Sequence, residues 1–133
     1  MNLSQVSESF GQENQTWLGS AHGTDAARSI TLDKSTFTSG THYPNGYLLS
    51  GIGLGKITAT GKYGPYDNAA SDGTQTLAGF LFTSIPVAST DVDPQGALLL
   101  HCVVVEALLP VSLGDSTAIA AAKVDVAGRI IFV

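Results

Sequence analysis

The feature that most constrains this chain is residues 97–109, which are apolar on both faces when read as a β-strand. Successive side chains of a strand point to opposite faces, and a half-exposed antiparallel strand alternates apolar with polar residues. The segment is therefore predicted to be a central strand that is buried on both sides or faces a subunit interface. Since a chain of 133 residues has little room for a doubly covered strand, the pattern favours an oligomer, with Leu98, Leu100 and Val104 as candidate contacts.

The rest of the chain from residue 30 onward reads as short strands separated by turns. The segment Tyr43-Pro44-Asn45-Gly46 predicts a turn, because Asn-Gly is a strong turn signal. Glycines at 51, 53 and 55 leave one face of a strand nearly bare, which permits close approach of neighbouring backbone or a bulge. Further strands are predicted at Ile30–Asp33, Tyr47–Thr58, Leu77–Val87 and Arg129–Val133.

One helix is predicted near the C-terminus, over the alanine-rich residues Thr117–Ala127. Asp115 or Ser116 can accept the first free backbone N–H groups as an N-cap, and Gly128 is placed to end the helix. The terminal strand that follows is apolar and would be adhesive if exposed, so it is expected inside a sheet. The fold class that follows is mainly β with one short helix.

Residues 1–29 differ from the remainder and are predicted to be an extended N-terminal arm, with the β-rich domain at 30–133. They are polar, and their few large apolar residues follow neither a helical nor a strand period. Such a segment cannot fold alone, so it is either a free tail or an arm held by a partner. Fully extended, 28 residues reach up to ~90 Å. Tryptophan is a favoured interface anchor, and the candidate anchors are Phe10, Trp17 and Leu18, with Val6 weaker.

Charge and composition exclude several classes of protein. The net charge is −5 with only six basic residues, which is too few for the basic surface that grips nucleic acid. No apolar run reaches the ~20 residues that span a bilayer, and the N-terminus lacks the pattern of a signal peptide. The single cysteine, Cys102, forms no disulfide within the chain and is expected to be a small buried hydrophobe.

No catalytic or metal-binding motif is complete. The glycines at 51–55 match neither dinucleotide nor phosphate-binding loops, and Asp91–Gly96 lacks the glutamate that an EF-hand loop needs at its twelfth position. None of the three histidines forms a metal-binding pair, and His101 is expected to be buried and hydrogen-bonded. The sequence therefore predicts no catalytic residue, no metal and no cofactor, and a protein that is not an enzyme.

A series of motifs resembles the lambda-type bacteriophage head decoration proteins, also called head-stabilisation proteins. No single motif is specific, and the order and spacing over residues 30–133 carry the resemblance. The motifs are Thr41-His42-Tyr43-Pro44-Asn45-Gly46, Ser50-Gly51-x-x-Leu54-Gly55-Lys56, Gly61-Lys62-Tyr63-Gly64-Pro65-Tyr66-Asp67, and Ser71-Asp72-Gly73-Thr74 with Ala78-Gly79-Phe80-Leu81.

The resemblance implies a small β-barrel or β-tulip-like domain that forms homotrimers. Such trimers would bind the major capsid protein at threefold and quasi-threefold positions of the expanded head. They would stabilise the head against internal DNA pressure, and their arms would add to capsid sheets. The protein would then lie on the outer surface of the virion, after assembly in the host cytoplasm, without touching nucleic acid or membrane.

Two other classes of function remain open. A small trimeric β enzyme or ligand-binding barrel would show a concave pocket with convergent polar groups and a perturbed titrating residue. A host-surface adhesin domain on a particle would show exposed aromatic side chains at one end, with Tyr43, Tyr63 and Tyr66 as the candidates.

Overall fold

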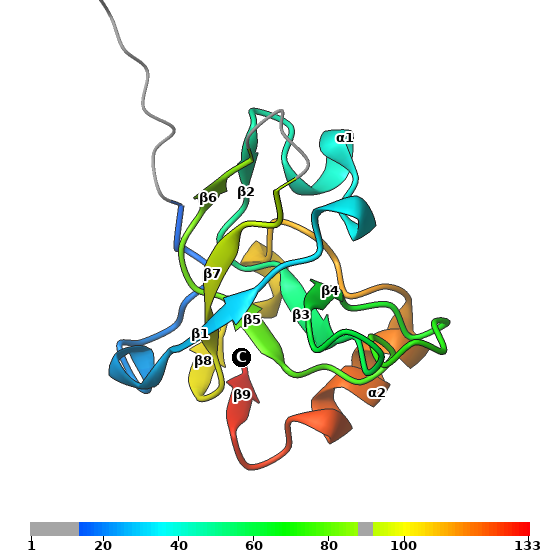
Figure 1. The fold of residues 1–133 in the computed structure, drawn as a ribbon. Coiled ribbons are helices and arrows are strands. Elements are labelled where there is room, and N and C mark those ends of the chain that lie inside the picture. Colours follow the sequence, from blue (N-terminus) through cyan, green and yellow to red (C-terminus); the bar gives the residue numbers. More distant parts are fainter. Residues whose placement is uncertain (1–13, 88–91) are drawn as a thin grey trace, which may run out of the picture.

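The computed structural model describes residues 14–87 and 92–133, and it is mainly β, as predicted (Figure 1). The largest sheet has five antiparallel strands in the order β1-β7-β5-β3-β4, β2 pairs with β6, and β8 pairs in parallel with β9. The strands are β1 Arg28–Thr31, β2 Tyr47–Leu48, β3 Gly53–Lys56, β4 Tyr63–Pro65, β5 Gly79–Leu81, β6 Ile85–Pro86, β7 Gln95–Leu99, β8 Cys102–Val104 and β9 Ile130–Phe132. The helices are α1 Ser39–His42, α2 Ser116–Asp125, and three 3-10 turns, η1 Thr24–Ala26, η2 Lys34–Thr36 and η3 Glu106–Leu108.

The five-stranded sheet curls into a partly open barrel. Its two edge strands, β1 and β4, approach each other at one parallel bridge between Leu32 and Tyr63. The N–H of Asp33 donates to the Tyr63 carbonyl across this bridge (2.8 Å). Buried side chains fill the barrel, and these are Ile30, Leu32, Phe37, Leu48, Ile52, Leu54, Leu81 and Leu98.

A second core lies between the outside of the barrel, the β8–β9 pair and α2. Trp17 and Phe80 are its largest fully buried side chains. The predicted C-terminal helix is confirmed as α2, and the Asp115 side chain caps it by accepting from the Ala118 N–H (2.8 Å). Gly128 follows the helix with a φ of 84°. The terminal strand is paired, as expected, although its partner is the parallel strand β8.

The predicted central strand over 97–109 is wrong as a single element. β7 ends at Leu99, the chain bends, and β8 begins at Cys102 in a different sheet. Both faces are apolar because the chain serves two cores: Leu98 is buried inside the barrel and Leu99 in the second core. The strand is thus covered on both sides within one protomer, and its pattern no longer argues for an oligomer.

The predicted long strands over 47–58 and 77–87 are also each divided in two. The first segment runs from β2 in the small β2–β6 pair to β3 in the barrel, and the second runs from β5 in the barrel to β6 in the small pair. The alternate glycines lie in the first of these segments, and all three are buried. A Cβ on Gly53 would lie 2.6 Å from the Leu113 side chain, and one on Gly55 would lie 2.6 Å from Thr74 Cα. The predicted close approach on the bare face is therefore confirmed.

Candidate functional site

The predicted arm anchor Trp17 lies inside the chain's own second core, with 1% of its surface exposed. Its indole N–H donates to the Ser50 hydroxyl (3.1 Å), and its ring centroid lies 5.7 Å from that of Phe80. A Cβ on Gly51 would lie 2.8 Å from the ring, so the missing side chain makes room for the indole. Trp17 therefore fixes the N-terminal segment to the domain and presents no free ring to a partner.

Leu18 and its neighbours extend the β8–β9 sheet. Leu18 forms an antiparallel bridge with Val104. On either side of this bridge, the Gly19 N–H donates to the Val103 carbonyl (2.7 Å) and the Val105 N–H to the Trp17 carbonyl (2.6 Å). Leu18 itself is half-buried. The outer edge of β8 is thus covered by the chain's own N-terminal segment. The other two predicted anchors, Val6 and Phe10, lie outside the described residues.

The three predicted trimer contacts occupy different environments. Leu98 and Val104 are buried in the barrel core and the second core of their own protomer. Leu100 is half-buried and lines the mouth of the barrel. Of the three, Leu100 is the one that a neighbouring molecule can reach.

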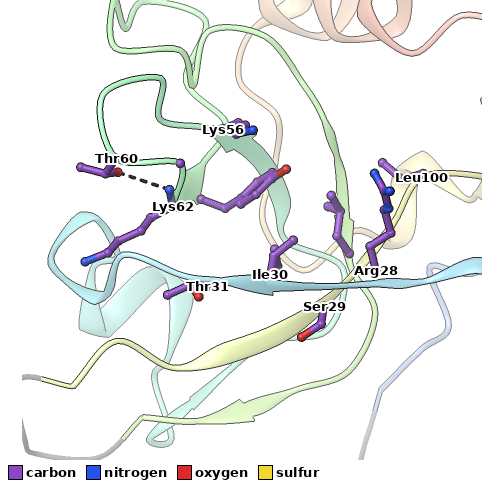
Figure 2. Close-up of a pocket in the computed structure, with 11 residues that line it drawn as sticks. Arg28, Ser29, Ile30, Thr31, Lys56, Thr60, Lys62 and Leu100 are labelled. Atoms are coloured by element: carbon purple, nitrogen blue, oxygen red, sulfur yellow. Dashed lines mark hydrogen bonds between the residues drawn. The ribbon is translucent and has the colours of Figure 1, made fainter.

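The barrel mouth is a concave site of about 670 Å³ at the seam between β1 and the β3–β4 hairpin (Figure 2). Arg28 and Ile30 point into it from β1, whereas Ser29 points to the other side of the strand. Beyond the Leu32–Tyr63 bridge the two walls diverge, which opens the seam. The lining residues are Arg28, Ser29, Ile30, Thr31, Lys56, Thr60, Gly61, Lys62, Tyr63, Leu98 and Leu100.

One wall of the mouth is the outer edge of β1. Ser29 lies opposite Ala97 in the β1–β7 register, and the Ala97 carbonyl accepts from the Phe82 N–H on the far side of β7 (2.9 Å). Because hydrogen-bonded and non-hydrogen-bonded pairs alternate along an antiparallel ladder, the Ser29 N–H and carbonyl point away from β7. They are available at the seam for another group.

The mouth gathers three of the chain's six basic residues, Arg28, Lys56 and Lys62. Lys62 is paired with the Asp93 carboxylate (2.6 Å), which also accepts from the Lys34 N–H (3.1 Å). This pairing raises the pKa of Lys62 and lowers that of Asp93. Within the described ranges, the two ion pairs involve neither Arg28 nor Lys56. The sequence carries no local signal for this site, because its cations come from separate segments that only the fold of the barrel brings together.

The titratable groups singled out in the sequence show no reactive arrangement. His101 is exposed rather than buried, because it lies in the bend between β7 and β8. Cys102 is buried, as predicted, and desolvation raises the pKa of its thiol to about 11. His42 is half-buried, its Nδ1 accepts from the Thr38 N–H (2.9 Å), and desolvation lowers its pKa.

The aromatic cluster that an adhesin would need is also not formed as expected. Tyr66 is buried and donates its hydroxyl hydrogen to the Ala118 carbonyl (2.9 Å). Tyr43 and Tyr63 are half-buried and pack against the barrel core. None of the three rings is fully exposed.

Residues 14–87 and 92–133 contain no group of three or more potential metal ligands. No helix in these ranges is long and apolar enough to cross a membrane. The described residues form a small barrel with strand edges and a mouth lined by charged side chains. Together these features define a small, mainly β domain with a concave, charged surface.

Comparison with known families identifies the class further. The family model of the bacteriophage lambda head decoration protein D matches residues 11–130, and the chain belongs to this family. The resemblance seen in the sequence is thereby confirmed, and the protein is a structural component of a phage head. The family is not an enzyme family. No curated protein and no solved structure gives a significant match.

Proposed function

We propose that the chain binds the outer surface of the expanded phage head as a homotrimer, at threefold and quasi-threefold positions, and stabilises the head against internal DNA pressure. The observation that carries the proposal is the family match over 11–130, nearly the whole chain. The partner is the major capsid protein. The low content of basic residues suits a surface that does not meet the packaged DNA.

The proposed mechanism is mechanical rather than catalytic. A decoration protein that binds only the expanded shell shifts the equilibrium towards that shell by its binding free energy. Three arms on one trimer raise the overall affinity, since each later contact is intramolecular once the first has formed. Each arm can then be weak on its own.

The packing of residues 17–19 supports assigning this role to the part of the N-terminal segment that precedes them. Residues 17–19 are bonded to β8, and Trp17 is in the core, so we place the capsid contact in residues 1–13. Val6 and Phe10 are its apolar anchors. The proposed mode of binding is addition to a sheet edge of the capsid protein, where backbone hydrogen bonds give affinity and a few side chains set the register.

The test is co-sedimentation with expanded, undecorated shells of the same phage. The intact chain is compared with a version that lacks residues 1–13, and a Val6→Ser/Phe10→Ser variant with the control Leu3→Ser. We expect saturable binding of the intact chain at three copies per threefold position. Binding should be lost on truncation, strongly reduced in the double variant and little changed in the control.

Two outcomes separate the parts of this proposal. Failure of the intact chain to bind would remove the capsid function. Full binding by the truncated chain, with an unchanged melting temperature, would keep the function and move the contact to the folded domain.

A further inference from the structure

We infer that the barrel mouth of one copy receives the acidic turn at residues 67–72 of the next copy, and that this head-to-tail contact builds the trimer. This inference rests on the homotrimer of the proposed function, and it specifies which two surfaces of neighbouring copies meet. It concerns two surfaces of the described chain: the mouth at the β1–β4 seam and the turn that follows β4.

The mouth has an apolar floor between two positive charges. Ile30 and Leu98 belong to the barrel core at its base, and the half-buried Leu100 lies beside them. Arg28 projects from the β1 wall and Lys56 from the β3 wall (Figure 2). Both are exposed. A complementary occupant therefore carries small apolar groups flanked by two negative charges.

The turn at 67–72 has that pattern. Asp67 and Asp72 stand at its ends, with the small residues Ala69 and Ala70 between them. Both carboxylates are exposed, and hydrogen bonds from Thr74 lower the pKa of Asp72, which keeps it ionised. The pKa of Tyr66 is raised by desolvation and then by Asp125, Asp67 and Asp115. A wider set of carboxylates thus lies around the base of the turn.

Local hydrogen bonds already hold the turn in shape. The Asp67 Oδ1 accepts from the Ala69 N–H (3.0 Å), and the Asp67 carbonyl accepts from the Ala70 N–H (3.0 Å). At the other end, the Asp72 Oδ1 accepts from the N–H and hydroxyl of Thr74 (3.0 and 2.6 Å). A preformed turn loses little conformational entropy on binding. The second oxygen of each carboxylate makes none of these bonds.

The occupant is a second copy rather than the turn of the same chain. No residue of the turn lines its own barrel mouth, so the two surfaces are separate on one protomer. A contact between two different surfaces of identical chains is heterologous, and it closes into a ring when the rotation between copies permits. A threefold ring is the closed form that the proposed function requires.

Charge reversal with rescue tests the contact by sedimentation equilibrium. In the mouth variant, Arg28→Glu and Lys56→Glu are combined. In the turn variant, Asp67→Lys and Ser71→Lys are combined. This variant keeps the bonds of Asp72 and the backbone bond from Ala70 to Asp67, and it loses the bond from the Ala69 N–H to the Asp67 side chain. Each variant should fall from the mass of three chains to that of one, 13.7 kDa. The chain that carries all four substitutions should regain the trimer, because the attraction is restored with its signs exchanged.

A matched control changes the same charge elsewhere. Lys34→Glu with Lys123→Glu alters the net charge as much as the mouth variant does, and neither residue lines the mouth. This control should remain trimeric. Far-UV circular dichroism and the melting temperature verify that each variant is folded. For a readout that keeps both cations of the mouth, a chain with Thr60→Cys and Asn68→Cys should form covalent trimers under a short bifunctional thiol cross-linker.

The outcomes distinguish this contact from the function on which it rests. A wild-type trimer that survives reversal of the mouth would overturn the contact and leave the homotrimer intact. Folded four-substitution chains that stay monomeric, or a control that loses the trimer, would overturn it as well. A wild type that stays monomeric in solution at all concentrations would overturn the contact, whereas shell binding at three copies per threefold position would keep the homotrimer of the proposed function.

Discussion

Two strand edges of this molecule are treated in opposite ways. The outer edge of β8 is covered by the chain itself, through the Leu18–Val104 bridge and the burial of Trp17. The outer edge of β1, which precedes the Leu32–Tyr63 bridge, faces the barrel mouth instead of another strand. Exposed cations border it there. Unpaired edges invite association with other chains unless they are covered or charged. The covered edge stabilises the fold, whereas the open edge borders the mouth that we propose as the contact between copies.

The largest effect is expected where the covered edge is anchored. Trp17→Ala removes a fully buried indole and leaves a cavity beside Phe80, which should lower the free energy of unfolding by about 3–5 kcal/mol. Equilibrium denaturation in urea measures it. Trp17→Phe keeps most of the ring packing and loses the bond to Ser50, so its loss should be clearly smaller. A loss below about 1 kcal/mol for the alanine variant would show that this edge does not depend on the tryptophan.

A pair of proline substitutions compares the two sides of β1. The Ile30 N–H points towards β7 in the derived register, and its side chain is buried, so Ile30→Pro should cost about 3 kcal/mol or more. The Ser29 N–H points to the open seam, and proline is tolerated on such an edge. Ser29→Pro should cost less than about 1.5 kcal/mol. Urea denaturation of both variants decides it, and equal losses would mean that the register of the open edge is wrongly assigned.

The fold was predictable where the signals were local. The cap at Asp115, the glycine after the helix and the apolar terminal strand each depend on a few neighbouring residues. The two-faced apolar segment was recognised as buried, yet its bend was not. Alternation shows that both faces are covered but cannot show that they belong to two cores.

The candidate site was harder to predict, because it depends on contacts far apart in the sequence. Trp17 was assigned to an interface since its neighbours are polar, while Gly51 was assigned to close packing. The structure shows that the glycine makes room for the indole. In the same way, Arg28, Lys56 and Lys62 carry no local motif, and only the β1–β4 seam joins them. Contacts between residues that are far apart in the chain leave no local pattern in a single sequence.

The reactivity of the Cys102 thiol reports on the covered edge of β8 without any substitution there. The Cys102 side chain is fully buried in β8, which pairs with β9, and its pKa of about 11 leaves very little thiolate at pH 8. We expect labelling by iodoacetamide to be slower than for an unfolded chain by about two orders of magnitude or more, since only the thiolate reacts. The label should enter at full rate in denaturant. Rapid labelling of the native protein would mean that the β8–β9 pair opens readily.

The smallest effect is expected at the open edge, where Asp93 pairs with Lys62 on an exposed surface. The pKa of Asp93 is lower in the folded chain than in the unfolded chain, where it is near 4. The pair therefore stabilises the fold above that unfolded pKa, and this stabilisation is lost as the pH falls through the folded pKa. The pKa of Lys62 is raised in the folded chain. Its share of the stabilisation is therefore present below the ordinary lysine pKa and is lost as the pH rises through the higher folded pKa. Asp93→Asn should therefore lower the melting temperature by a few degrees at most at pH 7, and the difference should shrink as the pH falls through the lowered folded pKa of Asp93. Added salt should shrink it, because exposed pairs are screened. The hydrogen bond from the Lys34 N–H is kept in this variant, because an amide oxygen also accepts it. A difference that persists after the carboxylate is protonated would therefore exclude the charge pair as its cause.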